Sequence, residues 1–496
     1  MRFLIHPPSV LDECPDIFRA YISGWDGRVF PTRVEIDGNL MACRRPVAES
    51  GSLHVAWPVE GFGQPVLATP SLPEREEPYL LAVELARGQI SQLRELYSER
   101  RTQGNAIPGR FPDLYQAAHR QFAKAVSAQD DVRRAAEFAR QALQASCEAG
   151  ELLTELYANQ QVALFRQRSG QPPVLLGCRL NQSVPSPQEA TRFCEAFSAA
   201  VVPVEWRLIE PAEGEYNWEL NDKQVAWCDD RKLHAIGGPL IDLSPNGLPA
   251  WLWQWEDDVL NLQSFLCDFV ETAISRYCGR IRHWEVAARA NSGGALTLGE
   301  EDRLSIVARV LEVARQVDEE IQLMIAVDQP WGEYQARGHH RLSPFQFADA
   351  LLRSGVGLSA LNLEFGVGYQ PRGTAPRDRM ALSRLIDRWA ALGIPLYVTL
   401  AVPSAVADEF EHFEGDLEVP AVATWKARWS DDAQARWLEE NVPLLMAKEP
   451  VVGIVWSHFS DAGVHRYPTA GLLREDGSPK PALERLKTIA NAGRDA

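Results

Sequence analysis

The chain has 496 residues, of which 46% are hydrophobic and 24% are charged, a composition typical of globular proteins. Its formal net charge of −17 disfavours nucleic acid and anionic lipid as partners, because long-range electrostatic repulsion opposes both. A neutral ligand such as a sugar fits this charge better, and the length leaves room for a large domain with at least one further module.

Other global features narrow the expectations further. No run of about 20 apolar residues is present, so we expect no membrane-spanning segment. The first residues, MRFLIHPPSV, lack the longer apolar stretch and cleavage site of a secretory signal, which predicts a cytoplasmic location. The eight cysteines form no C-x-x-C pair and no zinc-binding pattern with histidine, so we expect reduced thiols, no metal and no cofactor.

The N-terminal third of the chain changes character part-way. Up to about residue 90, short β-favouring pieces alternate with Gly, Pro and Asp-Gly turn signals, which predicts a small all-β, sandwich-like module over residues 1–105. Between residues 113 and 167, apolar residues recur at helical spacing, which predicts a helical segment over 106–170. The sequence SGQPP at residues 169–173 then breaks the last helix and predicts the start of a new domain.

From residue 174 onward, strand-like apolar runs alternate with helical patterns. Eight runs of this kind indicate a parallel sheet, and eight parallel strands are the number that closes a (β/α)8 TIM barrel, here over residues 171–490. A doubly wound sheet is the alternative, but no G-x-G-x-x-G or P-loop motif follows the early strands. The runs are VLLGCRL, AAVVPVEW, HAIGGPLI, IRHWEVAA, IQLMIAVD, LSALNLEF, PLYVTLAV and VVGIVWSH.

Several of these strand ends carry longer motifs. They include VEWRLIEPAEGEYNW after the second run, GRIRHWEVAARAN around the fourth, and VVGIVWSHFSD followed by GLLREDGSPKPALERL at the eighth. In this order the segments resemble those of family 10 glycoside hydrolases, the xylanase family. The resemblance covers most of residues 174–486 and implies a barrel that acts on carbohydrate.

The resemblance also implies that the catalytic residues of the family are missing. The acid/base glutamate of the family falls on Arg289, and its nucleophilic glutamate falls on Leu400. An arginine cannot donate a proton at neutral pH because its own pKa is too high. The chain is therefore expected to lack both catalytic glutamates of that family.

Carboxylates at other strand ends offer replacements, because residues at the C-terminal ends of barrel strands point into the site. Together they predict a strongly acidic floor, in which Glu364, Glu205 and Asp461 are the candidate catalytic groups. Glu364 could instead bind sugar hydroxyls or pair with Arg289, and Glu205 could pair with Arg207 or Arg289. The carboxylates concerned are Glu205, Asp242, Asp328, Glu364 and Asp461.

Aromatic and polar residues near the same strand ends are candidates for substrate binding. Tryptophan rings stack on the apolar faces of sugars, which favours Trp206, Trp331 and Trp456 as stacking platforms, although rim packing would also account for them. A metal held by His458 and His465 is the weaker alternative, since two histidines in one loop are a weak signal. The remaining predicted ligand-binding residues are His458, Asp242, Asp328 and Arg289, and Asp328 could equally be structural.

Three functions remain open from the sequence. The first is hydrolysis of O-glycosidic bonds in oligosaccharides or glycosides by relocated carboxylates. The second is a noncatalytic carbohydrate-binding barrel, a pseudoenzyme that binds sugar without turnover. The third is a protein-interaction scaffold whose N-terminal modules dock an undefined protein partner, which a large exposed apolar patch on residues 113–167 would favour.

Overall fold

The computed structural model describes residues 1–105, 107, 109–169, 174–406, 417–419 and 424–491. The breaks predicted between residues 105 and 106 and at 169–173 therefore fall at or on residues outside the described part. The division of the chain into three modules stays a prediction. No helix in these ranges combines the length and apolar content needed to cross a bilayer.

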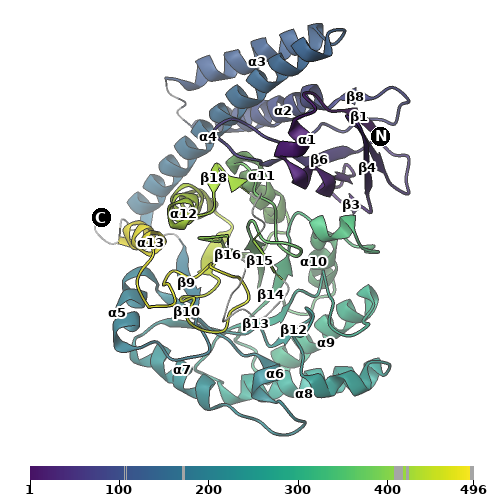
Figure 1. Cartoon of the computed structure of the whole chain (residues 1–496). Coiled ribbons are helices and arrows are strands. Elements are labelled where there is room, and N and C mark those ends of the chain that lie inside the picture. Colours follow the sequence, from purple (N-terminus) through teal and green to yellow (C-terminus); the bar gives the residue numbers. More distant parts are fainter. Residues whose placement is uncertain (106, 108, 170–173, 407–416, 420–423, 492–496) are drawn as a thin grey trace.

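Eight parallel strands close into a barrel, as the eight apolar runs predict (Figure 1). Each strand is buried on both faces, which is why the runs are continuously apolar rather than alternating. The barrel closes through the β19–β9 and β11–β13 pairs. A further short strand, β12 (Ile241–Asp242), pairs with the C-terminal residues of β13. The barrel strands are β9 (Leu175–Arg179), β10 (Ala199–Val202), β11 (His234–Gly237), β13 (His283–Ala288), β14 (Gln322–Asp328), β15 (Ala360–Gly366), β16 (Leu396–Ala401) and β19 (Val451–Trp456).

Helices surround the barrel, and several begin at residues that cap them. Ser186 and Ser343 each form a capping box with the third helical residue, so that two otherwise unpaired backbone N–H groups are satisfied. The helices outside the barrel are α5 (Pro187–Ala196), α6 (Trp206–Ile209), α7 (Glu219–Asp230), α8 (Val259–Arg276), α9 (Glu300–Val317), α10 (Pro344–Arg353), α11 (Arg379–Ala390), α12 (Asp431–Met446) and α13 (Pro481–Asn491).

The barrel interior changes from apolar to polar along its axis. Alternate strand residues face inward, since side chains of a strand point to opposite faces in turn. At one level these residues form a small apolar cluster of their own, which includes Met324, Ala360, Tyr397 and Val455. Two residues further along β15, β16 and β19, the side chains are the polar Asn362, Thr399 and Ser457, so the C-terminal end of the barrel is where chemistry can take place.

The N-terminal module consists of two four-stranded sheets, in the orders β4-β5-β1-β8 and β3-β2-β6-β7. The all-β interpretation is wrong for the last part of residues 1–105, because residues 81–102 form a long helix. This helix, α2, packs with the sheets and with α3 and α4 in one apolar core. The elements are β1 (Arg2–Leu4), α1 (Val10–Glu13), β2 (Tyr21–Ser23), β3 (Val29–Phe30), β4 (Arg33–Asp37), β5 (Leu40–Arg44), β6 (Ser52–Ala56), β7 (Val66–Ala68), β8 (Tyr79–Leu80), α2 (Leu81–Thr102), α3 (Phe111–Ser127) and α4 (Val132–Ser169).

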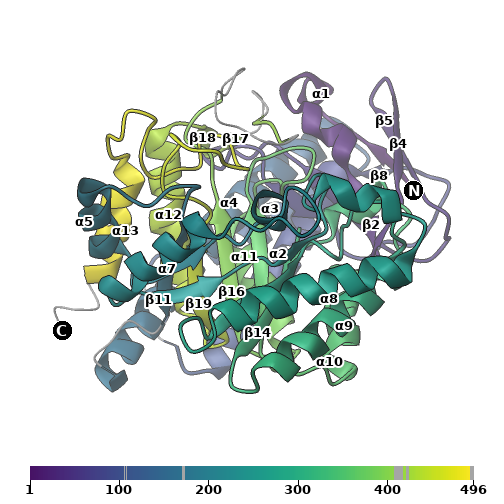
Figure 2. The ribbon, with the colours of Figure 1, turned by 90° about the horizontal axis from the view of Figure 1, so that it is seen from below.

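This module lies against one side of the barrel, where the purple strands sit beside the green barrel segments (Figures 1 and 2). Arg377 donates to the hydroxyl of Tyr21 at 2.7 Å and pairs with Glu333 at 3.0 Å, and all three side chains are buried or nearly so. Over residues 113–167, Leu164 is the large hydrophobic side chain that is exposed among those the structure describes. A single residue does not make the broad apolar patch that a protein scaffold would favour.

Candidate functional site

A cavity of about 480 Å³ lies at the C-terminal ends of the barrel strands. This volume falls within the range of small-molecule pockets, roughly 300–1,000 Å³. Strand ends and the loops that follow them line the cavity, as in other barrels of this type. The predicted site residues that the structure brings to it are Glu205, Trp206, Asp242, Arg289, Glu364 and His458.

Arg289 joins two acidic side chains in this cavity. Its Nη1 donates to Asp242 Oδ2 at 2.7 Å and its Nη2 donates to Glu364 Oε1 at 2.8 Å. The residue directly follows β13 and has a φ of +58°, a left-handed conformation that is uncommon and strained for a residue other than glycine. The ion pairs and the turn together hold the guanidinium inside the barrel, where its side chain is 7% exposed.

The two carboxylates that Arg289 contacts have different protonation behaviour. Burial raises the pKa of Asp242, but the charges of Arg289 and Arg466 outweigh burial and lower it to about 2. Burial also raises the pKa of Glu364, and here the nearby arginines do not reverse the shift. Glu364 Oε2 is buried and has no hydrogen-bond partner among the described residues. Asp242 is therefore ionised at neutral pH, whereas Glu364 is the group that can retain a proton nearer neutrality.

A second polar layer lies beneath this pair. Asn362 donates to Glu285 Oε2 at 2.5 Å and accepts from Thr399 Oγ1 at 3.0 Å, and Arg179 lies 3.4 Å from Glu285 Oε1. Glu285 therefore has a buried hydrogen-bonding role. Arg179 and Thr399 also line the cavity and were missed by sequence reasoning, although their inward position follows from the alternation along β9 and β16.

Glu205 lies at the rim and is held by two neighbours. Gln182 donates to Glu205 Oε1 at 2.6 Å, and Arg207 pairs with Oε2 at 3.0 Å. The pairing with Arg207 that the sequence suggested as one alternative is thus present. The expectation of a strongly acidic floor is wrong, because Glu205, Asp242 and Glu364 each have an arginine partner and Asp461 has a lysine partner.

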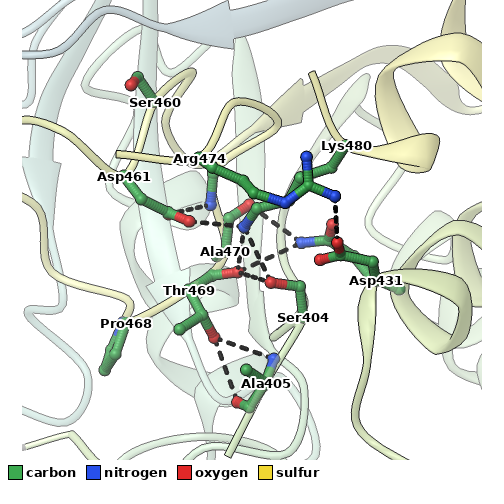
Figure 3. A network of polar contacts seen from close by, with 12 residues as sticks. Ser404, Ala405, Asp431, Ser460, Asp461, Pro468, Thr469, Ala470, Arg474 and Lys480 are labelled. Atoms are coloured by element: carbon green, nitrogen blue, oxygen red, sulfur yellow. Dashed lines mark hydrogen bonds and ion pairs between the residues drawn. The ribbon is translucent and has the colours of Figure 1, made fainter. Parts of the chain in front are cut away.

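The loop that follows β19, residues 457–480, covers one side of the cavity and is fastened by Lys480 (Figure 3). The buried ammonium of Lys480 contacts Asp461 Oδ2 at 2.5 Å, Ser404 Oγ at 2.8 Å and the carbonyl of Thr469 at 3.0 Å. Asp461 Oδ1 also accepts from the backbone N–H of Gly471 at 2.7 Å. Asp461, predicted as a candidate catalytic group, does not line the cavity, and its contacts are those of a loop anchor.

Two histidines of this loop lie beside Asp461. The rings of His458 and His465 stack with centroids 4.7 Å apart, and His458 Nε2 is 3.2 Å from Asp461 Oδ1. One potential ligand atom from each of the three residues lies within 4.8 Å of the others, so distance alone would allow a metal ion. The ammonium of Lys480, in contact with the same carboxylate, opposes a second cation there.

The three tryptophans predicted to stack on sugar are differently placed. Trp456 is 2% exposed, does not line the cavity and donates to the carbonyl of Ala470, so its ring is packed and not presented to the cavity. The indole of Trp206 is 1% exposed and stacks on Phe269, which leaves only a small part of it to the cavity. Trp331 lies outside the cavity, and Arg377 covers its ring at 4.5 Å.

Asp328, predicted as a ligand-binding residue, likewise lies outside the cavity. It is buried at the end of β14, where its Oδ2 accepts from Ser292 at 3.1 Å and from Gln329 at 3.3 Å. These bonds tie the loop after β13 to β14. The contacts of Asp328 are therefore those of a structural residue, the alternative role that the sequence left open.

A model of glycosyl hydrolase family 10 matches residues 200–488, which is more than half of the chain. The chain belongs to glycosyl hydrolase family 10. This membership confirms the resemblance drawn from the strand-end motifs.

Curated relatives in the family are similar over a limited part of their length. The chain is 24% identical over 204 residues to endo-1,4-beta-xylanase B of Thermotoga neapolitana, a match that covers 40% of this chain and 55% of that protein. It is 24% identical over 208 residues to endo-1,4-beta-xylanase A of Fusarium oxysporum f. sp. lycopersici, covering 40% of this chain and 60% of that protein. Less than two thirds of each relative is therefore matched.

Solved family 10 structures share the fold. Xylanase 10B from Thermotoga maritima superposes with a TM-score of 0.51 at 17% identity, covering 66% of this chain and 98% of that chain. A family 10 protein from Paenibacillus barcinonensis gives a TM-score of 0.50 at 17% identity, with 66% and 97% covered. At these identities the likeness concerns the barrel fold alone.

In this family 10 barrel, Leu400 stands at the position that the resemblance gives to the nucleophile. Leu400 is 1% exposed and belongs to the core between the strands and the helices, so it faces away from the cavity. Its neighbour Thr399 faces inward instead. Neither side chain is a carboxylate, so a shift by one residue does not supply a nucleophile on β16.

Proposed function

We propose that the barrel mouth binds an oligosaccharide or a glycoside without cleaving it by the two-carboxylate reaction of its family. The observation that carries the proposal is the placement of Arg289, which pairs with both Asp242 and Glu364 inside the cavity. A retaining glycosidase needs one carboxyl group as acid/base and a second as nucleophile, about 5 to 5.5 Å apart. A permanently charged guanidinium at the acid/base position cannot take the first role.

The lining of the cavity supports a sugar ligand. Asparagine, glutamine, serine and threonine side chains lie around it, and they offer both donors and acceptors for hydroxyl groups. Apolar surface comes from Leu180, Pro239 and Tyr467, against which the C–H face of a sugar ring can pack. Such a mixture of apolar walls with a few polar groups is typical of small-molecule sites.

Hydrolysis by a relocated acid is the second candidate, and one observation favours it. Glu364 combines a raised pKa with an oxygen that has no partner among the described residues. A buried carboxylic acid of this kind is the usual form of a glycosidase general acid. The second carboxylate would then be Asp242 or Glu205.

A turnover assay on the wild type and Glu364→Gln separates the two candidates. We expect both proteins to leave xylo-, gluco-, manno- and galacto-oligosaccharides intact by mass spectrometry, while calorimetry detects binding of at least one of them to the wild type. Glu301→Gln is the matched control, since Glu301 is 87% exposed on α9. Cleavage by the wild type and the control that Glu364→Gln lacks would overturn the binding-only proposal and establish the hydrolase.

A further inference from the structure

We propose that the cavity binds an acidic sugar, a uronic acid within an oligosaccharide or glycoside, and that Arg466 holds its carboxylate. The inference rests on the proposed function, because it names the ligand class of the same cavity. It also revises the expectation of a neutral sugar that the overall charge of −17 suggests.

Positive charge is concentrated in the cavity. Four arginines line it, Arg179, Arg207, Arg289 and Arg466, whereas the carboxylates that line it are Glu205, Asp242 and Glu364. This local excess runs against the composition of the whole chain, in which 67 acidic residues outnumber 50 basic ones. The lining thus carries one more basic than acidic side chain, which favours a ligand with a negative charge.

Among the four arginines, Arg466 is the one whose nearest carboxylate lies beyond hydrogen-bond distance. Asp242 is the nearest carboxylate, but its Oδ2 is already bonded to Arg289 at 2.7 Å and lies 3.9 Å from Arg466 Nη1, beyond hydrogen-bond distance. Asp242 Oδ1 accepts from the backbone N–H of Ser244 at 2.9 Å. Arg466 Nη1 instead donates to the neutral hydroxyl of Ser244 at 3.1 Å. One carboxylate is thus shared between two guanidinium groups.

Two buried donors in this cluster also lack acceptors. The Nε atoms of Arg289 and Arg466 are buried and have no hydrogen-bond partner among the described residues. Buried donors are nearly always paired in folded proteins, so the hydrogen-bonding capacity of these two guanidinium groups is not fully used by the described residues. Arginine can bind a carboxylate through two parallel N–H···O bonds, and Arg466 lines the cavity with its side chain 24% exposed.

The surrounding groups are compatible with an anion. Asp242 is the ionised carboxylate nearest to Arg466, and its charge is shared between Arg289 and Arg466. Deeper in the cavity, burial raises the pKa of Glu364, which favours its neutral form. Glu205 is engaged by Gln182 and Arg207 at the rim. The remaining neighbours of Arg466 in the cavity, Tyr467 and His465, carry no negative charge at neutral pH.

Calorimetry with matched trisaccharides tests the inference on the full chain. The probes are a trisaccharide with a terminal glucuronate, its uncharged methyl ester, and a sulfated trisaccharide of the same length. We expect the uronate to bind at least about ten-fold more tightly than its ester, since hydrogen bonds between charged groups are markedly stronger than neutral ones. Added salt should reduce this preference and leave the affinity for the ester unchanged.

Substitution of Arg466 assigns the contact. Arg466→Gln should abolish the preference for uronate over ester while the ester still binds, and Arg466→Lys should retain part of the preference. Arg353→Gln is the matched control, because Arg353 is a 79% exposed arginine on α10. Far-UV circular dichroism and the affinity for the ester show that each variant is folded.

The other possible results of these binding experiments each contradict a different part of the proposal. Equal affinities for uronate and ester would overturn the acidic-sugar inference and leave carbohydrate binding intact. Tighter binding of the sulfated probe would overturn the choice of a carboxylate, and a preference that survives in Arg466→Gln would overturn the role of Arg466. Absence of binding by all three probes, together with the neutral oligosaccharides, would overturn the proposed function itself.

Discussion

Arg289→Met is expected to lower the free energy of unfolding by about 3 to 5 kcal/mol at neutral pH, the usual effect of removing one partner of a buried ion pair. The variant leaves Glu364 buried without its ion-pair partner, and Asp242 keeps only the more distant Arg466. Methionine has similar length and no charge, so most of the loss reflects the uncompensated carboxylates rather than a cavity. The strained backbone at a φ of +58° remains in both proteins.

The pH dependence of the same variant gives an independent check. Burial already raises the pKa of Glu364, and removal of Arg289 is expected to raise it further. A carboxyl group whose pKa is raised by folding costs stability at neutral pH, and this cost disappears as the pH falls toward its unfolded value near 4.3. The deficit of Arg289→Met relative to the wild type should therefore shrink between pH 7.5 and pH 5.

Urea unfolding followed by tryptophan fluorescence at these two pH values measures both effects. Arg353→Met, on the exposed surface of α10, serves as the control and should change stability by less than about 1 kcal/mol. The double variant Arg289→Met with Glu364→Met should recover part of the loss, because it removes the unpaired charge. A single variant as stable as the wild type at pH 7.5 would mean that the pair contributes nothing to the fold.

Lys480→Met is expected to have an effect of similar size, about 3 to 5 kcal/mol, for the same physical reason. Lys480 is 2% exposed, and its ammonium is the shared partner of Asp461, Ser404 and the Thr469 carbonyl (Figure 3). Its loss leaves a buried carboxylate whose remaining contacts are Gly471 and His458. Because the loop of residues 457–480 also carries Arg466, we expect ligand binding to weaken along with stability.

The acid side of the stability profile distinguishes this effect from lost packing. Burial raises the pKa of Asp461, but its contacts with His458 and Lys480 outweigh burial and hold the pKa below its usual value. This contribution is present above the unfolded pKa, near 3.9, and is lost as the pH falls below it. The wild type and Lys480→Met should therefore converge in stability on acidification below about pH 4.

Thermal unfolding across this pH range provides the measurement. Lys223→Met is the matched control, since Lys223 is 61% exposed and its ion pair with Glu219 is worth at most about 1 kcal/mol. If Lys480→Met stayed below the wild type by the same amount at pH 3 as at pH 7, packing rather than charge would account for the loss. If it matched the control at pH 7, Lys480 would not be the anchor of the loop.

The sequence is most informative about the barrel because each of its strands is buried on both faces. Such strands appear as continuous apolar runs, and all eight runs proved to be barrel strands. Within the predicted all-β module, residues 81–102 instead form α2, which is buried by packing against the sheets and α4. Burial makes a short helix start and a buried strand look alike in sequence.

Within the site, the sequence identified several of the side chains that reach the cavity but not how their charges combine. Strand alternation determines that Glu364 and Thr399 face inward while Trp456 and Leu400 face the helices, so these orientations could be obtained from the residues alone. The pairing of Arg289 with Glu364, which lies 75 residues away, could not be obtained from the sequence. A pattern along one strand carries no information about the charge that lies opposite it.

The sequence by itself therefore determined the family, the parallel barrel and the absence of a carboxylate on β16, since each depends on local pattern and residue type. Tertiary structure alone decided that the acidic side chains are paired. Closing the barrel brings Asp242, Arg289, Glu364 and Arg466 from four separate segments into one buried space. In that low-dielectric space, which charges are neighbours decides which of them are neutralised, which keep a proton and which donor is left for a ligand.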